Sequence, residues 1–306
     1  MRRLQLLTLF CLLVPAQVLG VSRFNERNHT GLLLLYGFDD GQLSSTSHPP
    51  QARDFSGRYL MGNLTTSATA VSWNATRQGM QVPQAGGGDR AFSPLTSANI
   101  TPLLQNEFTL EFFISSGPLP TLPAQNLLIA GFGDWPSGSA FPTCDVSNTV
   151  SEGGWRLYSV YGDGTRVSIR FTAVVLRFGV PTCALLLFQI LPNNLVHIVV
   201  RAKNGEMDMT SYAVLGGQNS YSFLDETTFD PSLWARHHAP LYVATPHSSG
   251  AWTGTVYMIA MFDRYISDVE ITNNDVFGPP NSHAYGTVSA LATPESEPIT
   301  LYPAAS

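Results

Sequence analysis

Charged residues are scarce in this chain. They make up 12% of its 306 residues, and Lys203 is the only lysine. Acidic residues outnumber basic ones by 22 to 16, which gives a formal net charge of −6 at pH 7. Because nucleic acids and anionic lipids are themselves negative, this balance argues against partners of either kind that bind through overall charge.

Motifs of several enzyme classes are also missing. The chain contains no Gly-x-Ser-x-Gly nucleophile elbow, no glycine-rich phosphate loop and no His-Glu-x-x-His pattern. No pair of histidines has the spacing of a zinc finger, and two mature cysteines cannot complete a zinc site alone. The sequence therefore offers no motif for these hydrolases, for nucleotide binding or for structural zinc.

No stretch of the mature chain keeps a helical period of 3.6 residues. Instead, apolar segments of β character recur between clusters of Gly, Pro, Asn and Ser, which form turns. This pattern predicts an all-β fold, a two-sheet antiparallel β-sandwich of the jelly-roll type. The expected strands are Gly31–Phe38, Phe108–Ile114, Asn126–Phe132, Trp155–Tyr161, Thr165–Val175, Ala184–Ile190, Leu195–Arg201, Glu206–Leu215, Pro240–Thr245 and Gly254–Tyr265.

The first twenty residues have the pattern of a secretory signal peptide. Two arginines precede the apolar run Leu4–Val14, and Val18 and Gly20 are small residues before a cut after Gly20. The alternative is a membrane anchor, but the run is short for a bilayer and Pro15 interrupts its end. Loss of Arg2 and Arg3 changes the net charge from −6 to −8. We therefore expect a secreted, extracellular protein, or one at the cell surface if the natural chain continues to an anchor.

Two cysteines remain after Cys11 leaves with the signal peptide. In an oxidising compartment, Cys144 and Cys183 are expected to form a disulfide that closes a loop of 39 residues (183 − 144). Two free buried thiols are the alternative.

Four Asn-x-Thr sequons follow the signal peptide, and none has proline in its middle position. On a secretory route they are candidate glycosylation sites. All four lie before residue 102, so their glycans would cover one part of the surface and leave the rest open to a partner. They begin at Asn28, Asn63, Asn74 and Asn99.

The order of these segments resembles the laminin-G-like (concanavalin A-like) jelly-roll domain. The opening Leu34–Gly41 is similar to that family's first strand and Phe-Asp turn, and Asp54–Gly57 to its Asp-x-Ser-Gly turn. The closing run Trp252–Ser267 resembles the final strand and its trailing Tyr-Asp-Arg-Ala-Leu-Ser. Matching segments in the right order span about 235 residues, and they define a fold more than a function.

The resemblance implies a calcium site on two turns. Asp39, Asp40 and Asp54 stand where the family places its calcium-proximal turns, and calcium binds oxygen ligands of this kind. Two departures from the family pattern occur, and the first of them puts the calcium site in doubt. Tyr257 and Met258 replace an acidic pair often found in the last strand, and Leu195 replaces a family tryptophan. Aspartates are also ordinary turn formers, so calcium is the only cofactor that the sequence brings into question.

One strand resembles the catalytic strand of laminarinase-type glycosidases of the same architecture. That motif is Glu-x-Asp-x-x-Glu, and here Glu206 and Asp208 are present while Ser211 takes the last acidic position. A retaining mechanism needs two carboxylates about 5 Å apart, so the motif is incomplete. We therefore do not expect an enzyme.

Other candidates come from single residues and loops. Trp252, flanked by Ser and Gly on a loop, is a candidate exposed platform for a sugar ring. His197 is expected to be a hydrogen-bonded core residue. The long loops Phe132–Gly154 and Gly216–Ala239 are expected to carry a binding surface.

The sequence thus predicts a signal peptide at 1–20, a laminin-G-like domain at 21–277 and a proline-rich linker at 278–306. That last segment resembles the start of a cadherin-like or immunoglobulin-like repeat, and a disordered tail is the alternative. The expected function is a binding module for a carbohydrate or an extracellular protein, as the N-terminal part of a larger adhesive or receptor-like protein. The alternatives are a polysaccharide-acting glycoside hydrolase and a spacer domain without a ligand.

Overall fold

The structure is a computed structural model of the whole chain. It describes residues 29–38, 51–66, 71–73, 79–83, 91–117, 127–132, 154–160, 166–177, 180–203, 206–213, 218–224, 227–228, 240–244 and 252–277. The predicted signal peptide, the proline-rich segment 278–306, Asn28, Asp39, Asp40, Asn74 and Cys144 lie outside these residues. Among the described helices, none is long and apolar enough to cross a membrane.

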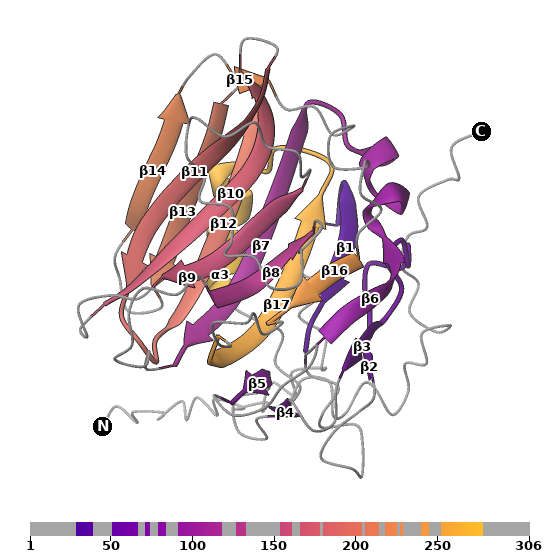
Figure 1. The fold of residues 1–306 in the computed structure, drawn as a ribbon, viewed down its shortest axis with the longest axis vertical. Helices are drawn as coiled ribbons and strands as arrows, with labels where there is room; N and C mark the ends of the chain where they lie inside the picture. Colours follow the sequence, from indigo (N-terminus) through magenta and orange to yellow (C-terminus); the bar gives the residue numbers. More distant parts are fainter. Residues whose placement is uncertain are drawn as a thin grey trace, which may run out of the picture.

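Two antiparallel sheets pack face to face (Figure 1). Sheet A contains, in spatial order, β14 (Gln218–Leu224), β13 (Glu206–Ala213), β12 (Leu195–Lys203), β7 (Glu107–Ser116), β17 (Gly254–Phe262), β5 (Met80–Val82) and β4 (Ser72–Trp73), with β1 (Leu32–Tyr36) also paired to β17. Sheet B contains β11 (Val180–Ile190), β10 (Val167–Arg177), β9 (Trp155–Val160), β8 (Leu127–Phe132), β16 (Pro240–Val243), β6 (Ala91–Thr96), β3 (Leu64–Thr66) and β2 (Gln51–Ala52), with β15 (Thr227–Thr228) paired to β10. The predicted all-β sandwich is confirmed.

The core lies between the sheets and follows the strand alternation. On β7, Phe108, Leu110, Phe112 and Ile114 all point inward and are fully buried. Trp155 on sheet B joins the two layers, because its ring lies 5.7 Å from Phe112 of sheet A. Aromatic pairs at such separations add to the energy of simple burial.

Most predicted strands appear with shifted ends. The apolar run predicted at 184–190 is part of the longer strand β11, which starts at Val180, and the run predicted to end at Tyr265 stops at Phe262. Two short 3-10 helices, η2 (Ser97–Asn99) and η3 (Thr101–Leu103), follow β6.

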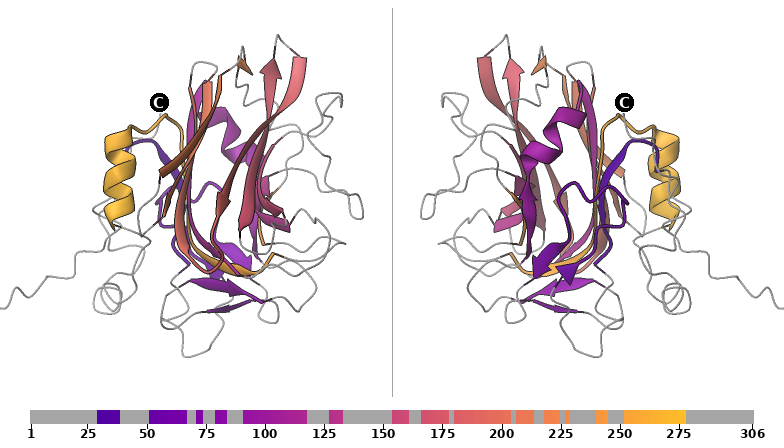
Figure 2. Two further views of the ribbon diagram at one scale, coloured as in Figure 1. Left: turned by 90° about the vertical axis from the view of Figure 1, so that its left-hand side faces the viewer. Right: turned by 90° about the vertical axis from the view of Figure 1, so that its right-hand side faces the viewer.

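Among the described residues, one segment departs from the expected lack of helical periodicity. Helix α3 (Asp268–Phe277) follows β17 and lies against the outer face of sheet A (Figure 2). Its buried Ile271 packs with Leu32, Phe113, Val199 and Phe262 in a second apolar cluster, separate from the core between the sheets. One outer face of the sandwich is therefore covered.

Candidate functional site

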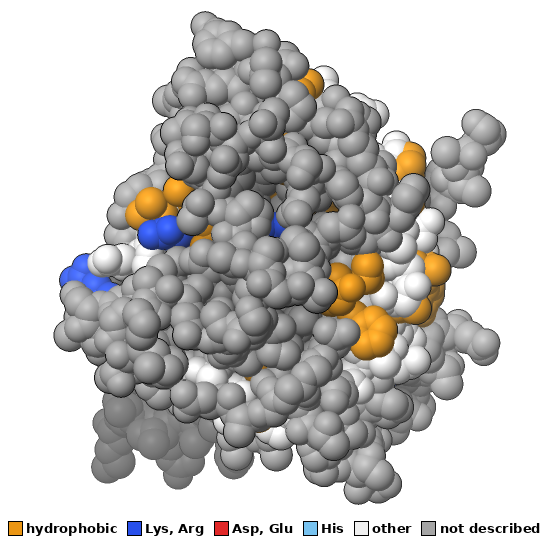
Figure 3. Space-filling view, in the orientation of Figure 1, with side chains coloured by type: hydrophobic (Ala, Val, Ile, Leu, Met, Phe, Trp, Pro, Cys, Tyr) orange, Lys and Arg blue, Asp and Glu red, His pale blue; other side chains and the backbone are white. Residues whose placement is uncertain are grey.

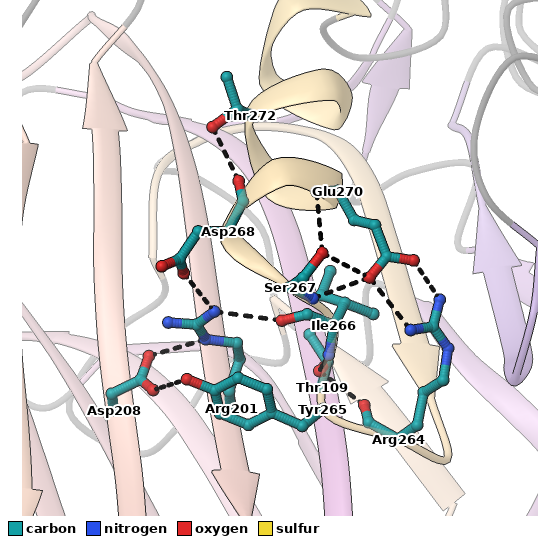
Figure 4. Close-up of polar contacts among 10 residues, drawn as sticks. All are labelled: Thr109, Arg201, Asp208, Arg264, Tyr265, Ile266, Ser267, Asp268, Glu270 and Thr272. Carbon is teal, nitrogen blue, oxygen red and sulfur yellow. Dashed lines mark hydrogen bonds and ion pairs between the residues drawn. The ribbon is translucent and has the colours of Figure 1, made fainter.

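Helix α3 begins at a reciprocal cap. The backbone N–H of Ser267 donates to Oε2 of Glu270 at 2.8 Å, and the backbone N–H of Glu270 donates to Oγ of Ser267 at 3.3 Å. This is a capping box, which satisfies backbone donors that a helix start leaves open. Arg264 also donates through both terminal nitrogens to Glu270 (Figure 4). These hydrogen bonds hold the pKa of Glu270 near 2, with the Arg264 bonds as the largest cause.

Arg201 joins the helix start to sheet A (Figure 4). Its Nε donates to Oδ1 of Asp208 at 3.0 Å, and its Nη1 donates to the carbonyl of Ile266 and to Oδ1 of Asp268. The guanidinium also lies 4.3 Å from the centre of the Tyr265 ring, whose hydroxyl donates to Oδ2 of Asp208. Burial raises the pKa of Asp208, and Arg201 and Tyr265 oppose that shift. Both oxygens of Asp208 are therefore engaged in fastening α3 to the sheet.

The contacts of Asp208 show how the residues of the incomplete glycosidase motif are placed on β13. Glu206 is exposed and Asp208 half-buried on the outer face of β13, whereas Ser211 is buried on the other face of that strand. In register, Glu206 lies opposite Lys203 and Asp208 opposite Arg201. The strand therefore places one carboxylate in solvent and the other in an ion pair.

His197 is a fully buried residue under α3, which confirms the predicted core position, but neither of its ring nitrogens makes a hydrogen bond to a described residue, unlike the prediction. Its Nε2 lies 3.3 Å from Oε1 of Glu111, and its Nδ1 lies 3.3 Å from Oδ1 of Asp275 on the helix. The ring stacks on Phe113 with centroids 4.1 Å apart. Nδ2 of Asn274 donates to Glu111 at 2.9 Å, so these polar groups hold the second turn of α3 on sheet A.

Asp54 links the first strand to the next turn. Its Oδ1 accepts from the backbone N–H groups of Leu35 and Ser56, at 3.0 and 2.9 Å. Burial raises its pKa to about 6, and these two hydrogen bonds oppose the shift. Its buried Oδ2 has no hydrogen-bond partner in the described part of the chain.

The described residues do not by themselves fit a calcium ion. Calcium takes about six to eight oxygens, and Asp54 offers one that is not already bonded. No group of three or more acidic, histidine or cysteine side chains that could hold a metal occurs among the described residues. Calcium stays a prediction that depends on Asp39 and Asp40.

Trp252 was expected to be an exposed platform, and that expectation is wrong. Its side chain is fully buried. The physical reason is Gly254, which has a φ of +154°. A Cβ at this position would lie 2.5 Å from the Trp252 ring and 2.3 Å from the carbonyl oxygen of Ser115, so only glycine lets the ring fold inward over the strand start.

The remaining predicted sites are partly described. Asn99 is exposed, while Asn63 is half-buried and its Oδ1 accepts from the backbone N–H of Asp54 at 3.0 Å. Cys183 lies on β11 opposite Val174 of β10. Glycosylation and the disulfide both stay predictions.

The outer face of sheet B differs from that of sheet A, because α3 lies on the opposite side of the sandwich (Figure 2). One cross-strand row runs over six strands of this face, each member paired in register with the next. The row consists of Phe92, Tyr242, Gly131, Arg156, Thr172 and Leu185. We call it the long row. Its aromatic rings, its arginine and Leu185 are all half-buried, so they keep part of their surface in solvent.

A second, shorter row lies beside the long row. It consists of Leu128, Tyr158, Arg170 and Leu187, again paired in register. Leu187 is 42% exposed, whereas Tyr158 is buried although it faces outward. Burial raises the pKa of Tyr158, and the charges of Arg170 and Arg156 oppose this shift together with a hydrogen bond to Arg170. Both arginines therefore lie close enough to the Tyr158 hydroxyl to affect its ionisation.

The face combines apolar and basic groups. Figure 3 shows apolar side chains gathered over β6 and β16, and Lys or Arg side chains over the strands on the left. Near the apolar end, Pro94 and Leu95 are exposed beside Phe92 and Tyr242. Aromatic surface next to a few polar groups is typical of a ligand site.

Sequence reasoning missed both rows. It assigned β9 and β10 as strands but did not ask which of their residues would face outward. The alternation Trp155, Leu157, Ser159 against Arg156 and Tyr158 carried that signal, since alternate strand residues share a face.

Comparison with known proteins yields structural similarity only. No protein-family model matches the chain, and no curated protein matches its sequence. The receptor-binding domain of botulinum neurotoxin D is 11% identical, with a TM-score of 0.47, over 80% of this chain and 52% of that one. Trypanosoma rangeli sialidase in complex with sialic acid is 14% identical, with a TM-score of 0.44, over 81% of this chain and 32% of that one.

A third structure is matched over almost its whole length. Domain 4 of AbnA, an extracellular arabinanase from Geobacillus stearothermophilus in complex with arabinotriose, is 13% identical, with a TM-score of 0.42, over 80% of this chain and 98% of that one. Many structures matched are longer, and the chain spans about 30% of a bacteriophage CBA120 tailspike domain. Likeness at this level does not define a function.

Proposed function

We propose that the protein is a secreted binding module that recognises a carbohydrate on the outer face of sheet B. The observation that carries this proposal is the long row, which places Phe92 and Tyr242 in line with Arg156 and Thr172. Half-exposed aromatic rings can pack on the apolar faces of sugar rings, and guanidinium and hydroxyl groups can bond to sugar hydroxyls.

The contrast between the two outer faces supports this choice of surface. On sheet A, helix α3 and the apolar cluster around Ile271 already occupy the face. On sheet B, Leu95 is 42% exposed beside exposed Pro94 and half-buried Phe92 and Tyr242. A contiguous apolar patch of this kind marks a site of interaction, whereas single exposed apolar residues are common.

Binding without catalysis is favoured over the glycosidase alternative. The laminarinase-type mechanism uses a pair of carboxylates, and the described strands of sheet B contain no Asp or Glu. On sheet A, Asp208 is bonded to Arg201 and Tyr265.

Three wider expectations remain part of the proposal. They are a laminin-G-like domain over residues 21–277, secretion after loss of residues 1–20, and a place in a larger adhesive or receptor-like protein. An extracellular protein as partner is the second candidate, because the same exposed apolar patch could bind a protein surface.

A glycan array tests the proposal. The full chain, secreted with its own leader and purified, is applied with calcium and again with a chelator. The double variant Phe92→Ala and Tyr242→Ala is compared with Val269→Ala, which removes an exposed apolar side chain from α3 on the opposite side. We expect specific glycan binding that the double variant loses and the Val269 variant keeps. Absence of binding by the natural chain, or equal binding by both variants, would overturn the assignment.

A further inference from the structure

A buried hydroxyl lies next to an exposed asparagine in the segment that follows β6. Thr101, the first residue of η3, is only 4% exposed, yet its Oγ1 has no hydrogen-bond partner among the described residues. Asn99, the last residue of η2, is exposed. The two residues are the first and third positions of an Asn-x-Thr sequon, and the buried Ile100 lies between them.

The described contacts of Thr101 give its hydroxyl no structural use. A buried hydroxyl without a hydrogen bond costs free energy, because it gives up its bonds to water on folding. Valine has nearly the same shape and would avoid this cost. The hydroxyl does not cap η3 either, since the N-cap residue is Ile100 and no side chain caps that helix start. The presence of threonine at position 101 therefore needs another explanation.

Thr109 is a buried threonine whose hydroxyl does stabilise the fold. It is fully buried on β7, and its Oγ1 donates to the carbonyl of Arg264 at 2.8 Å and accepts from the backbone N–H of Ile266 at 3.1 Å. This hydroxyl joins β7 to the segment before α3. Thr101 and Thr109 are thus alike in burial and different in hydrogen bonding, which makes them a matched pair for experiment.

We infer that Asn99 carries an N-linked glycan and that Thr101 is present for this modification, because the acceptor sequon requires a hydroxyl at its third position. The inference rests on the proposed secretion and not on the proposed sugar-binding face. The donor is an oligosaccharide joined to a lipid through a diphosphate. Nδ2 of Asn99 bonds to C1 of the first sugar and loses one proton, while the bond from C1 to the diphosphate oxygen breaks and the lipid diphosphate leaves with the electron pair. Since Thr101 is buried in the folded protein, the transferase reads its hydroxyl before this segment folds.

The surroundings of Asn99 suit a glycan. Pro102 and Leu103 follow on η3, and both are exposed. The backbone N–H of Leu103 donates to the carbonyl of Ile100 at 2.9 Å, so this apolar pair is held close to the asparagine. The first sugar has open space at Asn99, and its apolar face can cover part of Pro102 and Leu103.

The other sequon with both its asparagine and its threonine described begins at Asn63. Its Thr65 is half-buried, so solvent reaches that side chain and the hydroxyl needs no special explanation. Asn63 is itself half-buried, and its Oδ1 accepts from the backbone N–H of Asp54 at 3.0 Å. This asparagine therefore has a structural role without a glycan, and the orphan hydroxyl distinguishes the site at Asn99.

Site mapping tests the modification. The full chain is expressed with its own leader in a glycosylating eukaryotic host, N-glycans are released enzymatically in heavy-oxygen water, and the peptide containing Asn99 is analysed by mass spectrometry. We expect the label on Asn99 in the natural chain and in Thr101→Ser, and its loss in Thr101→Val, with the other sequons unchanged. A secreted chain with an unmodified Asn99 would overturn the inference and leave the proposed function standing. A chain retained in the cell without a glycan on any sequon would overturn both the inference and the proposed secretion.

Stability tests the role of the hydroxyl. Thr101→Val is made in an Asn99→Gln background, so that no glycan at this site contributes, and Thr109→Val in the same background is the matched control. We expect Thr101→Val to leave the melting temperature unchanged or to raise it. Thr109→Val should lower it by about 2–6 °C, because both of its hydrogen bonds are lost. An equal decrease in both variants would show that the Thr101 hydroxyl serves the fold, and it would overturn the role assigned to Thr101.

Discussion

Arg201 and Asp208 face each other on adjacent strands of sheet A, with Nε of the guanidinium 3.0 Å from Oδ1 of the carboxylate. The Arg201 side chain is only 8% exposed, so its charge depends on its protein partners. Asp268 supplies one of them, but that carboxylate is mostly in solvent. Asp208 is therefore the main buried partner of the arginine that fastens α3.

The variant Asp208→Asn is expected to lower the free energy of unfolding by about 2 kcal/mol, because it leaves a largely buried positive charge with weaker compensation. Urea denaturation measures this difference. Glu206→Gln is the control, since Glu206 is exposed two residues away on the same strand and should change stability by less than about 0.5 kcal/mol. Equal losses in both variants would show that the ion pair does not set the stability of this region.

The Glu270 carboxylate gives a prediction about acid stability. Its folded pKa of about 2 is below the ordinary value of 4.5, so the folded state favours the charged form. This stabilisation is complete above about pH 4.5 and is lost as the pH falls toward 2. Glu270→Gln should destabilise the protein by about 1 kcal/mol at pH 7 and weaken its loss of stability below pH 4.5. Thermal melts from pH 2 to 7 measure both effects, and Val269→Ala, on the same helical turn, should leave the acid profile unchanged.

Asp54 should have the opposite pH dependence. Its carboxyl releases a proton near pH 3.8 in the unfolded chain and near pH 6 in the folded one. The folded state therefore holds more protons between these values, and the contribution of Asp54 to the unfolding free energy falls by about 3 kcal/mol as the pH rises through them. Asp54→Asn keeps an acceptor for Leu35 and Ser56 and removes the titration. Its stability should change less between pH 4 and 6 than that of the natural protein.

The same variant bears on calcium. If Asp54 binds calcium with Asp39 and Asp40, added calcium should raise the melting temperature of the natural protein at pH 7, and Asp54→Asn should lose that gain. A melting temperature that is equal in calcium and in chelator would make the calcium prediction wrong.

The predicted disulfide can be tested chemically. Peptide mapping without reductant should recover one cross-linked pair of peptides containing Cys144 and Cys183. By loop entropy, Cys183→Ser should reduce stability by about 3–4 kcal/mol for a closed loop of 39 residues. Labelling of both thiols by an alkylating reagent in the unreduced, denatured protein would instead show that they are free.

The strands were predictable from the sequence because their signals are local. Turn residues divide the chain, and apolar runs such as the one at 108–114 lie within observed strands. Helix α3 was missed since it is short and its first-turn Val269 is 70% exposed, so no helical period stands out. The Ser267 to Glu270 spacing was the available local signal for its start.

The candidate site could not be predicted in the same way. The long row joins Phe92, Arg156 and Tyr242, which are far apart in the chain and meet only through strand pairing. Net charge averages over the whole surface, so it carries no information on how charges divide between the sheets. All acidic residues of the described strands lie on sheet A. Trp252 failed as a prediction because its neighbours in sequence are small and polar, while its neighbours in space are buried.

Helix α3 and Lys203 lie on the same outer face of the sandwich, opposite the outer face of sheet B. Lys203, the only lysine, has a side chain that is 45% exposed and pairs with Glu107 on the outer face of sheet A, the same face that carries α3. Attachment to a solid support through the Lys203 amine would hold the protein at this face and leave the long row of sheet B facing away from the support. Helix α3 ends at Phe277 on that side too. A tether fused after the helix would therefore leave the outer face of sheet B pointing away from the point of attachment.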